Sequence, residues 1–286
     1  MRHPVLMTLC LGSAVVLSAC NTQSDADVAR ALASVNVIDE SNLSEVMLTS
    51  ADPEEAVAYF LRASIEKPDR IDLKRGLAKS LVRAKKPSDA SEVWKAVLGM
   101  PGATDEDRVD YAEALIRMNE WERAEAALNA VPPTYETFDR YRLEAMVADF
   151  RKDWKKADSF YEIAAGLTTT PASVLNNWGF SKLSRGDHAG AERLFTEALT
   201  YDTKLFTAKN NLVLARAAQG KYDLPVMSMT QVEKAQLLYT AALSAIKRGD
   251  VNIGRTLLQQ AVDTHPQHFE QAARALAALD ANVGQG

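Results

Sequence analysis

The sequence predicts an all-α fold, a helical solenoid built from antiparallel helix pairs, and a regularly repeated small residue is the main reason. Alanine recurs at spacings of 34, 34, 33 and 34 residues, at Ala56, Ala90, Ala124, Ala157 and Ala191. A bulky apolar residue follows each alanine four positions later, at Phe60, Trp94, Leu128, Tyr161 and Phe195. Residues four apart share one helix face, where a small side chain lets a neighbouring helix approach closely. A period in the mid-thirties indicates stacked helix pairs that cannot bury their apolar faces alone.

The other helix of each pair shows the same register. A small residue stands twelve positions before each alanine, at Ser44, Ala78, Ala112, Ala145 and Gly179. Polar turns separate the two helices, and prolines such as Pro101 and Pro171 end the units. In residues 172–203, Trp178, Gly179, Ala191 and Phe195 stand where the signature residues of the tetratricopeptide repeat (TPR) stand, so the chain resembles that family. The resemblance implies a right-handed solenoid.

We divide the chain into units by this register. A repeat array over 37–268 is expected, followed by a capping helix and tail over 269–286. The units are 37–70, 71–104, 105–137, 138–171, 172–205, a degenerate 206–234, and 235–268, where Gly254 and Leu258 resume the pattern. In the degenerate unit, Pro225 falls where the repeated alanine should stand, so the second helix is expected to be replaced by an extended connector over 222–231. That connector is either a tolerated deletion or a segment that lines a groove or contacts a partner.

The amino terminus resembles a bacterial lipoprotein signal. A short basic start precedes an apolar run over residues 5–17, which is too short to span a bilayer. The run ends in Leu17-Ser18-Ala19-Cys20, which resembles a lipobox; the alternative is an ordinary secretory signal with an incidental cysteine. The resemblance implies cleavage after residue 19, lipidation of Cys20 and a tether over 20–36. Because Asn21 is not the aspartate linked to inner-membrane retention, we expect a lipid anchor in the outer membrane, facing the periplasm.

Charge and cysteine content exclude several functions. The chain carries a formal charge of −5 and has no basic stripe with interleaved aromatic residues, so nucleic acid is not an expected partner. The one basic cluster, residues 151–156, falls at a turn and is either solvated or a lipid or partner contact. Cys10 leaves with the signal and Cys20 carries lipid, so no thiol remains for disulfides or metal binding.

Catalytic motifs are absent from the sequence. It contains no phosphate loop, nucleophile elbow or zinc-helix motif. His265 and His268 lack a third ligand nearby, which makes a poor metal site. We therefore expect neither enzymatic activity nor a cofactor nor a metal.

A groove for a protein partner is the expected site. In TPR proteins the first helix of each unit lines the concave surface, and the family's commonly used position falls on Asn42, Asn177 and Asn211. Asn176 and Asn210 repeat the same spacing. Amide side chains both donate and accept, so a row of them can hold an extended peptide backbone; alternatively, these asparagines have no ligand.

The architecture resembles the TadD family of TPR lipoproteins from Tad (Flp-type) pilus systems. That resemblance rests on the lipobox, the chain length and the divergent repeats, and it implies assistance in assembling a pilus secretin. The alternatives are a general outer-membrane or envelope-assembly scaffold, an adaptor for peptidoglycan hydrolases, and, with little support, an enzyme that uses the solenoid as a platform. The sequence leaves the oligomeric state open.

Overall fold

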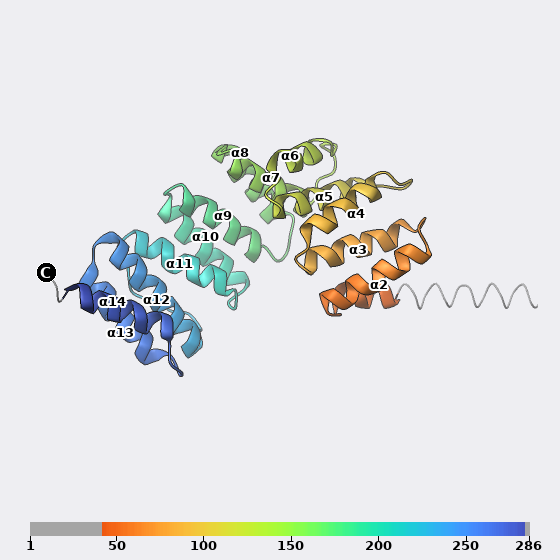
Figure 1. The fold of residues 1–286 in the computed structure, drawn as a ribbon. Helices are drawn as coiled ribbons and strands as arrows, with labels where there is room; N and C mark the ends of the chain where they lie inside the picture. Colours follow the sequence, from red (N-terminus) through yellow and green to blue (C-terminus); the bar gives the residue numbers. More distant parts are fainter. Residues whose placement is uncertain (1–41, 284–286) are drawn as a thin grey trace, which may run out of the picture. The chain divides into compact units, whose positions relative to one another are not determined.

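The computed structural model describes residues 42–283, and the regular structure in that part of the chain is α-helical (Figure 1). The predicted fold class, an all-α array of antiparallel helix pairs, is confirmed. The chain forms two compact units that divide between Gly102 and Ala103. Pro101 and Gly102 lie at this division, and Gly102 has a φ of 88°.

The first unit contains a helical stretch over residues 42–49 and three further helices. These are α2 (Pro53–Glu66), α3 (Ile71–Arg83) and α4 (Pro87–Leu98). Asp52 starts α2 because its carboxylate accepts the backbone N–H of Glu54 at 2.9 Å, and a proline occupies the first turn. Helix α3 packs against both α2 and α4, and Phe60 of α2 and Trp94 of α4 are buried.

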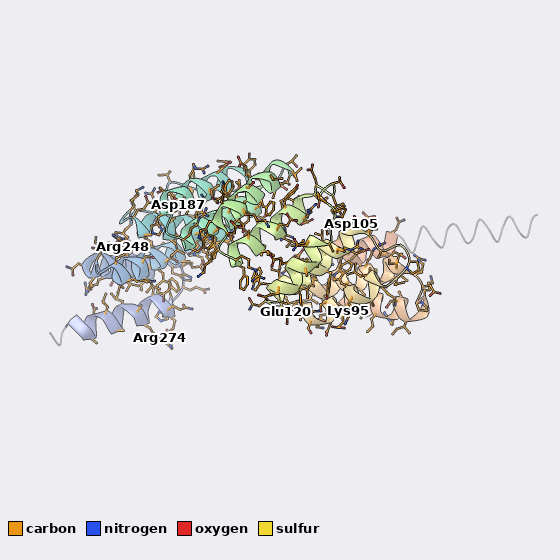
Figure 2. All side chains as sticks on the ribbon, turned by 90° about the horizontal axis from the view of Figure 1, so that it is seen from above. Lys95, Asp105, Glu120, Asp187, Arg248 and Arg274 are labelled. Atoms are coloured by element: carbon orange, nitrogen blue, oxygen red, sulfur yellow. The ribbon has the colours of Figure 1, made fainter. Side chains whose placement is uncertain are left out.

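The second unit continues the pattern with ten helices in its described residues. They are α5 (Asp105–Arg117), α6 (Trp121–Asn129), α7 (Phe138–Phe150), α8 (Trp154–Gly166), α9 (Ala172–Ser184), α10 (His188–Tyr201), α11 (Phe206–Ala218), α12 (Gln231–Arg248), α13 (Val251–Thr264) and α14 (Glu270–Val283). Helices α9, α10 and α11 lie side by side (Figure 1). Side-chain caps start several of these helices; Asp187 (Figure 2), for example, accepts the N–H of Gly190 at 2.9 Å.

Most first helices are followed by a turn with a left-handed backbone conformation. Gly249 after α12 has a φ of 93°, and one residue after each of the five preceding first helices has a φ between 59° and 86°, at Lys85, Asn119, Lys152, Gly186 and Gly220. These positions are spaced by 34, 33, 34 and 34 residues, so the repeat is one of backbone geometry as well as of side chains. Glycine and asparagine adopt this conformation readily, whereas lysine does so at a cost.

The degenerate unit has no second helix. After α11, residues 219–230 contain no helix or strand, and α12 begins at Gln231. The unit boundary predicted at 235 therefore falls inside α12. The reason is a capping box in which the Thr230 hydroxyl accepts the N–H of Glu233 and the Glu233 carboxylate accepts the N–H of Thr230.

The predicted repeat-core residues form the seams between helices. All of them are buried except Trp178, which is half-buried. Ala56, Ala90, Ala124, Ala157 and Ala191 have no exposed surface, and Phe60, Trp94, Leu128, Tyr161, Phe195 and Leu258 are at most 2% exposed. Gly179 and Gly254 are buried because side chains occupy the space that a Cβ would need: Phe195 against Gly179, and Ile246 against Gly254.

Candidate functional site

A groove of about 610 Å³ lies in the second unit, and we call it the asparagine groove. It is lined mainly by α7, α9 and α11, which are the first helices of three successive repeats. Four of the five predicted groove residues line it: Asn176, Asn177, Asn210 and Asn211. Asn42 does not; it is an exposed residue of the first unit.

The four asparagines are partly engaged with one another and with α12. The Nδ2 of Asn211 donates to the Oδ1 of Asn176 at 3.1 Å, so these two amides bridge α9 and α11. The hydroxyl of Thr240 donates to the Oδ1 of Asn210 at 2.8 Å. Within residues 42–283, the Asn177 side chain has no hydrogen-bond partner. Each bridged amide keeps a second hydrogen or lone pair, so the row offers donors and acceptors to a ligand.

Aromatic rings form the rest of the groove wall. They come from five helices: Trp121, Phe150, Trp154, Tyr161, Phe180 and Phe206. Phe180 on α9 is 56% exposed and Phe150 on α7 is 44% exposed, which is unusual for large apolar side chains. Trp121 stacks on Phe150 with ring centroids 4.8 Å apart. The groove therefore combines exposed apolar surface with amide groups, the combination typical of ligand sites.

One carboxylate, that of Asp149 on α7, lines the asparagine groove. Its Oδ2 accepts from the Tyr161 hydroxyl at 2.8 Å, and its Oδ1 accepts from the Ser181 hydroxyl at 2.6 Å. Burial raises the pKa of the Asp149 carboxyl above its ordinary value, although these two hydrogen bonds act in the opposite direction. Burial and the adjacent carboxylate also raise the pKa of Tyr161, so its hydroxyl stays protonated and donates.

A second carboxylate, Asp158 on α8, has a structural role beside the groove. It accepts from the Trp178 indole at 2.6 Å and from the Lys182 ammonium at 3.0 Å, and it pairs with Arg185. Burial opposes ionisation of Asp158, but these donors together hold its pKa below the ordinary value. The network joins α8 to α9 and explains why Trp178 keeps its ring edge near the surface.

In the basic cluster at 151–156, two of the four basic side chains make local contacts. Arg151 pairs with Glu125 at 2.7 Å, and Lys156 lies over the ring of Phe160. Trp154 is half-buried and lines the asparagine groove. The cluster's tryptophan therefore belongs to the groove wall, while Arg151 and Lys156 contact acidic or aromatic neighbours and Lys152 and Lys155 are exposed.

The connector lies against the core instead of lining the asparagine groove. Leu224 and Met229 pack on the cluster around α12 and α13, and Met227 packs beside Phe195. The ammonium of Lys209, whose side chain is only 3% exposed, donates to the Ser228 carbonyl oxygen at 2.9 Å and to Glu233 at 3.1 Å. With α10 and α11 the connector encloses a separate hollow of about 550 Å³.

Other predicted features have simpler outcomes. Cys20 and the signal lie outside the described residues. His265 and His268 hydrogen-bond to Gln267 and Glu270 respectively, and residues 42–283 contain no group of three or more His, Cys, Asp or Glu side chains that could hold a metal. In the same part of the chain no helix is both long enough and apolar enough to span a membrane.

Sequence reasoning missed Asp149 and the aromatic wall. A signal for Phe180 was present, because it stands 34 residues after Met146, an apolar residue of the preceding first helix that lines the same groove. Asp149 gave no such signal, because its role depends on Tyr161 and Ser181 from two other helices.

Comparison with known proteins identifies the fold. No protein-family model matches the sequence, and no curated protein matches it. The chain is similar in structure to a chain of the APC/C heterotetramer Cut9–Hcn1, with a TM-score of 0.61 and 14% identity over 82% of this chain and 48% of that one. It therefore spans about half the length of that chain. It is also similar to PilW, described as a widely conserved type IV pilus biogenesis factor (TM-score 0.56, 14% identity, 80% of this chain and 93% of that one).

A third similar structure is a tetratricopeptide repeat protein from Parabacteroides merdae, with a TM-score of 0.55 and 12% identity over 83% of this chain and 96% of that one. At these identities the likeness shows the fold alone. The chain therefore has a TPR-type fold.

Proposed function

We propose that this TPR-type chain is a non-enzymatic scaffold that binds an extended segment of a protein partner in the asparagine groove. The observation that carries the proposal is the groove itself, where four amides and two exposed aromatic rings, Phe150 and Phe180, share one hollow of about 610 Å³. Amides can pair with a peptide backbone whatever its side chains, and exposed rings such as Phe180 can pack against apolar side chains of the segment.

The test begins with co-purification of partners from detergent-solubilised membranes, followed by calorimetry with the partner identified. The double variant Asn177→Ala, Phe180→Ala removes an unengaged amide and an exposed ring. Its melting temperature should stay close to that of the wild type, because neither side chain is part of the core and alanine favours helix. Partner affinity should fall by about 1–3 kcal/mol, which is about 5- to 150-fold.

A matched control keeps this test specific. Asn252 and Ile253 are both exposed on α13 and do not line the asparagine groove. The double variant Asn252→Ala, Ile253→Ala should therefore bind the partner as the wild type does. Equal affinities for the groove variant and this control would place the binding surface elsewhere, with the connector as the next candidate.

The proposal extends to the cell envelope through the lipobox-like sequence. We infer that Cys20 is lipidated and holds the protein at the outer membrane, facing the periplasm. The physical support is that two or three acyl chains anchor a protein stably. Cys20→Ala should then release the protein from membranes or trap the uncleaved precursor. Normal processing with normal membrane association in that variant would contradict the anchor.

The cellular role we propose is assistance in assembling a Tad/Flp-type pilus, with a secretin as the candidate partner. It is supported by the TadD-like architecture, and PilW provides an example of a pilus biogenesis factor with a similar fold. Deletion of the gene should abolish surface fibres and leave resistance to detergents and large antibiotics unchanged. Sensitivity to these agents with intact fibres would instead favour an envelope-assembly scaffold or a peptidoglycan-hydrolase adaptor.

A further inference from the structure

The charge of the asparagine groove is unbalanced. Asp149 is the one ionisable acid or base among the groove residues apart from the buried phenol of Tyr161. Both of its oxygens are held by neutral hydroxyl groups, one from Tyr161 on α8 and one from Ser181 on α9. These hydrogen bonds orient the carboxylate but do not neutralise it.

The cations near Asp149 are paired with other carboxylates. Arg142 pairs with Glu113 at 3.1 Å and with Asp139 at 3.0 Å. Lys182 and Arg185 both pair with Asp158. In residues 42–283, Asp149 therefore has no ion-pair partner, and burial raises its pKa more than its two hydrogen bonds and the nearby charge of Arg185 lower it.

An exposed aromatic ring stands in the same groove. Phe180 immediately precedes Ser181 on α9, and its ring is 56% exposed. The faces of two other groove rings are already used, since Arg151 lies over Phe150 and Arg185 lies over Trp154. Phe180 has no such neighbour among the described residues. An exposed ring in the same groove as a carboxylate without an ion-pair partner can receive a cationic side chain, through an ion pair and a cation–π contact.

We propose that the asparagine groove contains a subsite for a lysine or arginine side chain of the bound segment, formed by Asp149 and Phe180. This inference rests on the proposed function, since it specifies which segment the groove takes: an extended peptide with a basic residue among apolar ones. The bound cation supplies the direct ion-pair partner that Asp149 lacks within residues 42–283, so the subsite gives selectivity in a groove whose amides otherwise accept any backbone.

The test uses the full-length chain in detergent and fluorescein-labelled nonapeptide pools with degenerate flanks. The central residue is fixed as lysine, arginine, norleucine or glutamate, and norleucine keeps the aliphatic stem of lysine without its charge. Fluorescence anisotropy gives the affinity of each pool. The wild type should bind the lysine and arginine pools about tenfold more tightly than the norleucine pool, and added salt should reduce this ratio.

Variants test whether Asp149 causes the preference for a cationic side chain. Asp149→Asn keeps the shape of the side chain and should bring the lysine-to-norleucine ratio close to one, and Asp149→Lys should favour the glutamate pool. Glu162→Gln removes an exposed carboxylate of α8 outside the groove and should keep the wild-type ratio. Circular dichroism verifies that each variant is folded, and the salt dependence of the wild type tests the subsite without any variant.

The outcomes separate this inference from the proposed function. Suppose that the wild type binds all pools equally and that the double variant Asn177→Ala, Phe180→Ala binds all of them more weakly. This result would refute the cation subsite and keep the groove as a peptide site. A cation preference that survives in Asp149→Asn would also refute the subsite. Absence of binding for every pool would refute both.

Discussion

Gly179→Ala tests whether the helix seams are as tight as the structure indicates. A Cβ built on Gly179 would lie 2.6 Å from Cε1 and 2.8 Å from Cδ1 of Phe195. The shorter distance is 0.8 Å below 3.4 Å, the near limit of ordinary contact. Phe195 has no exposed surface and packs against Leu212 and Ala215, so its ring cannot move aside freely. Overpacking of this kind costs about 1–3 kcal/mol.

A matched glycine isolates that steric cost. Gly166, the last residue of α8, has no heavy atom within 4 Å of an added Cβ and no positive φ. Gly166→Ala should therefore gain only the helix propensity of alanine, up to about 1 kcal/mol. Calorimetric melting of the full-length chain should show Gly179→Ala unfolding about 3–9 °C below Gly166→Ala.

A compensating change provides a stricter test. Ala112 and Leu128 occupy the equivalent positions in an earlier helix pair, where both are buried. Adding Gly179→Ala to the Phe195→Leu variant reproduces that alanine–leucine pair. The Gly179→Ala change should therefore destabilise this variant less than it destabilises the wild type, with a coupling free energy of about 1–2 kcal/mol. Gly179→Ala melting at or above Gly166→Ala, or additive effects in the double variant, would refute the claim that the Phe195 ring requires glycine.

Three further predictions follow from the turns, the groove and the connector. Lys152→Gly should stabilise the protein by about 1 kcal/mol, because Lys152 has a φ of 59°, whereas Lys155→Gly inside α8 should destabilise it by a similar amount; both are measured by thermal melting. Asp149→Asn should raise the melting temperature near neutral pH and have less effect in acid. The reason is that the pKa of Asp149 is raised in the folded state, so its ionisation destabilises the fold above that pKa and the penalty disappears as the pH falls through it. Lys209→Met should cost about 1–3 kcal/mol and speed tryptic cleavage at Lys221, because it removes the ammonium that holds the connector.

Each of these three predictions has a result that would contradict it. Equal effects of the two glycine substitutions would contradict strain at the turn. A stabilisation by Asp149→Asn that grows in acid would contradict the sign of the pKa shift. Unchanged proteolysis in Lys209→Met would mean that apolar contacts of the connector, and not the lysine, hold it in place.

The repeat core could be predicted from the sequence because burial in a solenoid follows a local period. Ala191 and Phe195 lie on one helix face whatever surrounds that helix, and every repeat places the same face against its neighbour. Asn176, Asn177, Asn210 and Asn211 lie on one surface for the same reason, since a spacing of 34 residues returns each position to the same side of the next first helix. These predictions needed only the spacing of residues along the chain.

Backbone geometry at the turns was harder to predict from the sequence. Gly186 and Asn119 are residues that favour a left-handed conformation, so their turns could have been expected. Lys85 and Lys152 adopt it only because the helices on either side fix the path of the chain. The division between Gly102 and Ala103 is likewise a matter of which helices pack, because the alanine spacing continues across it.

By itself, the sequence determined the fold class, the pairing of helices, the buried seams and the row of asparagines, because each of these repeats with the chain's own period. Tertiary structure alone decided what the groove can recognise. Asp149 is an ordinary aspartate until Tyr161 and Ser181, from two other helices, hold its carboxylate inside the groove. Phe180 is also exposed because no other side chain within residues 42–283 covers its ring, and contacts between side chains of separate helices do not repeat with the period of the sequence.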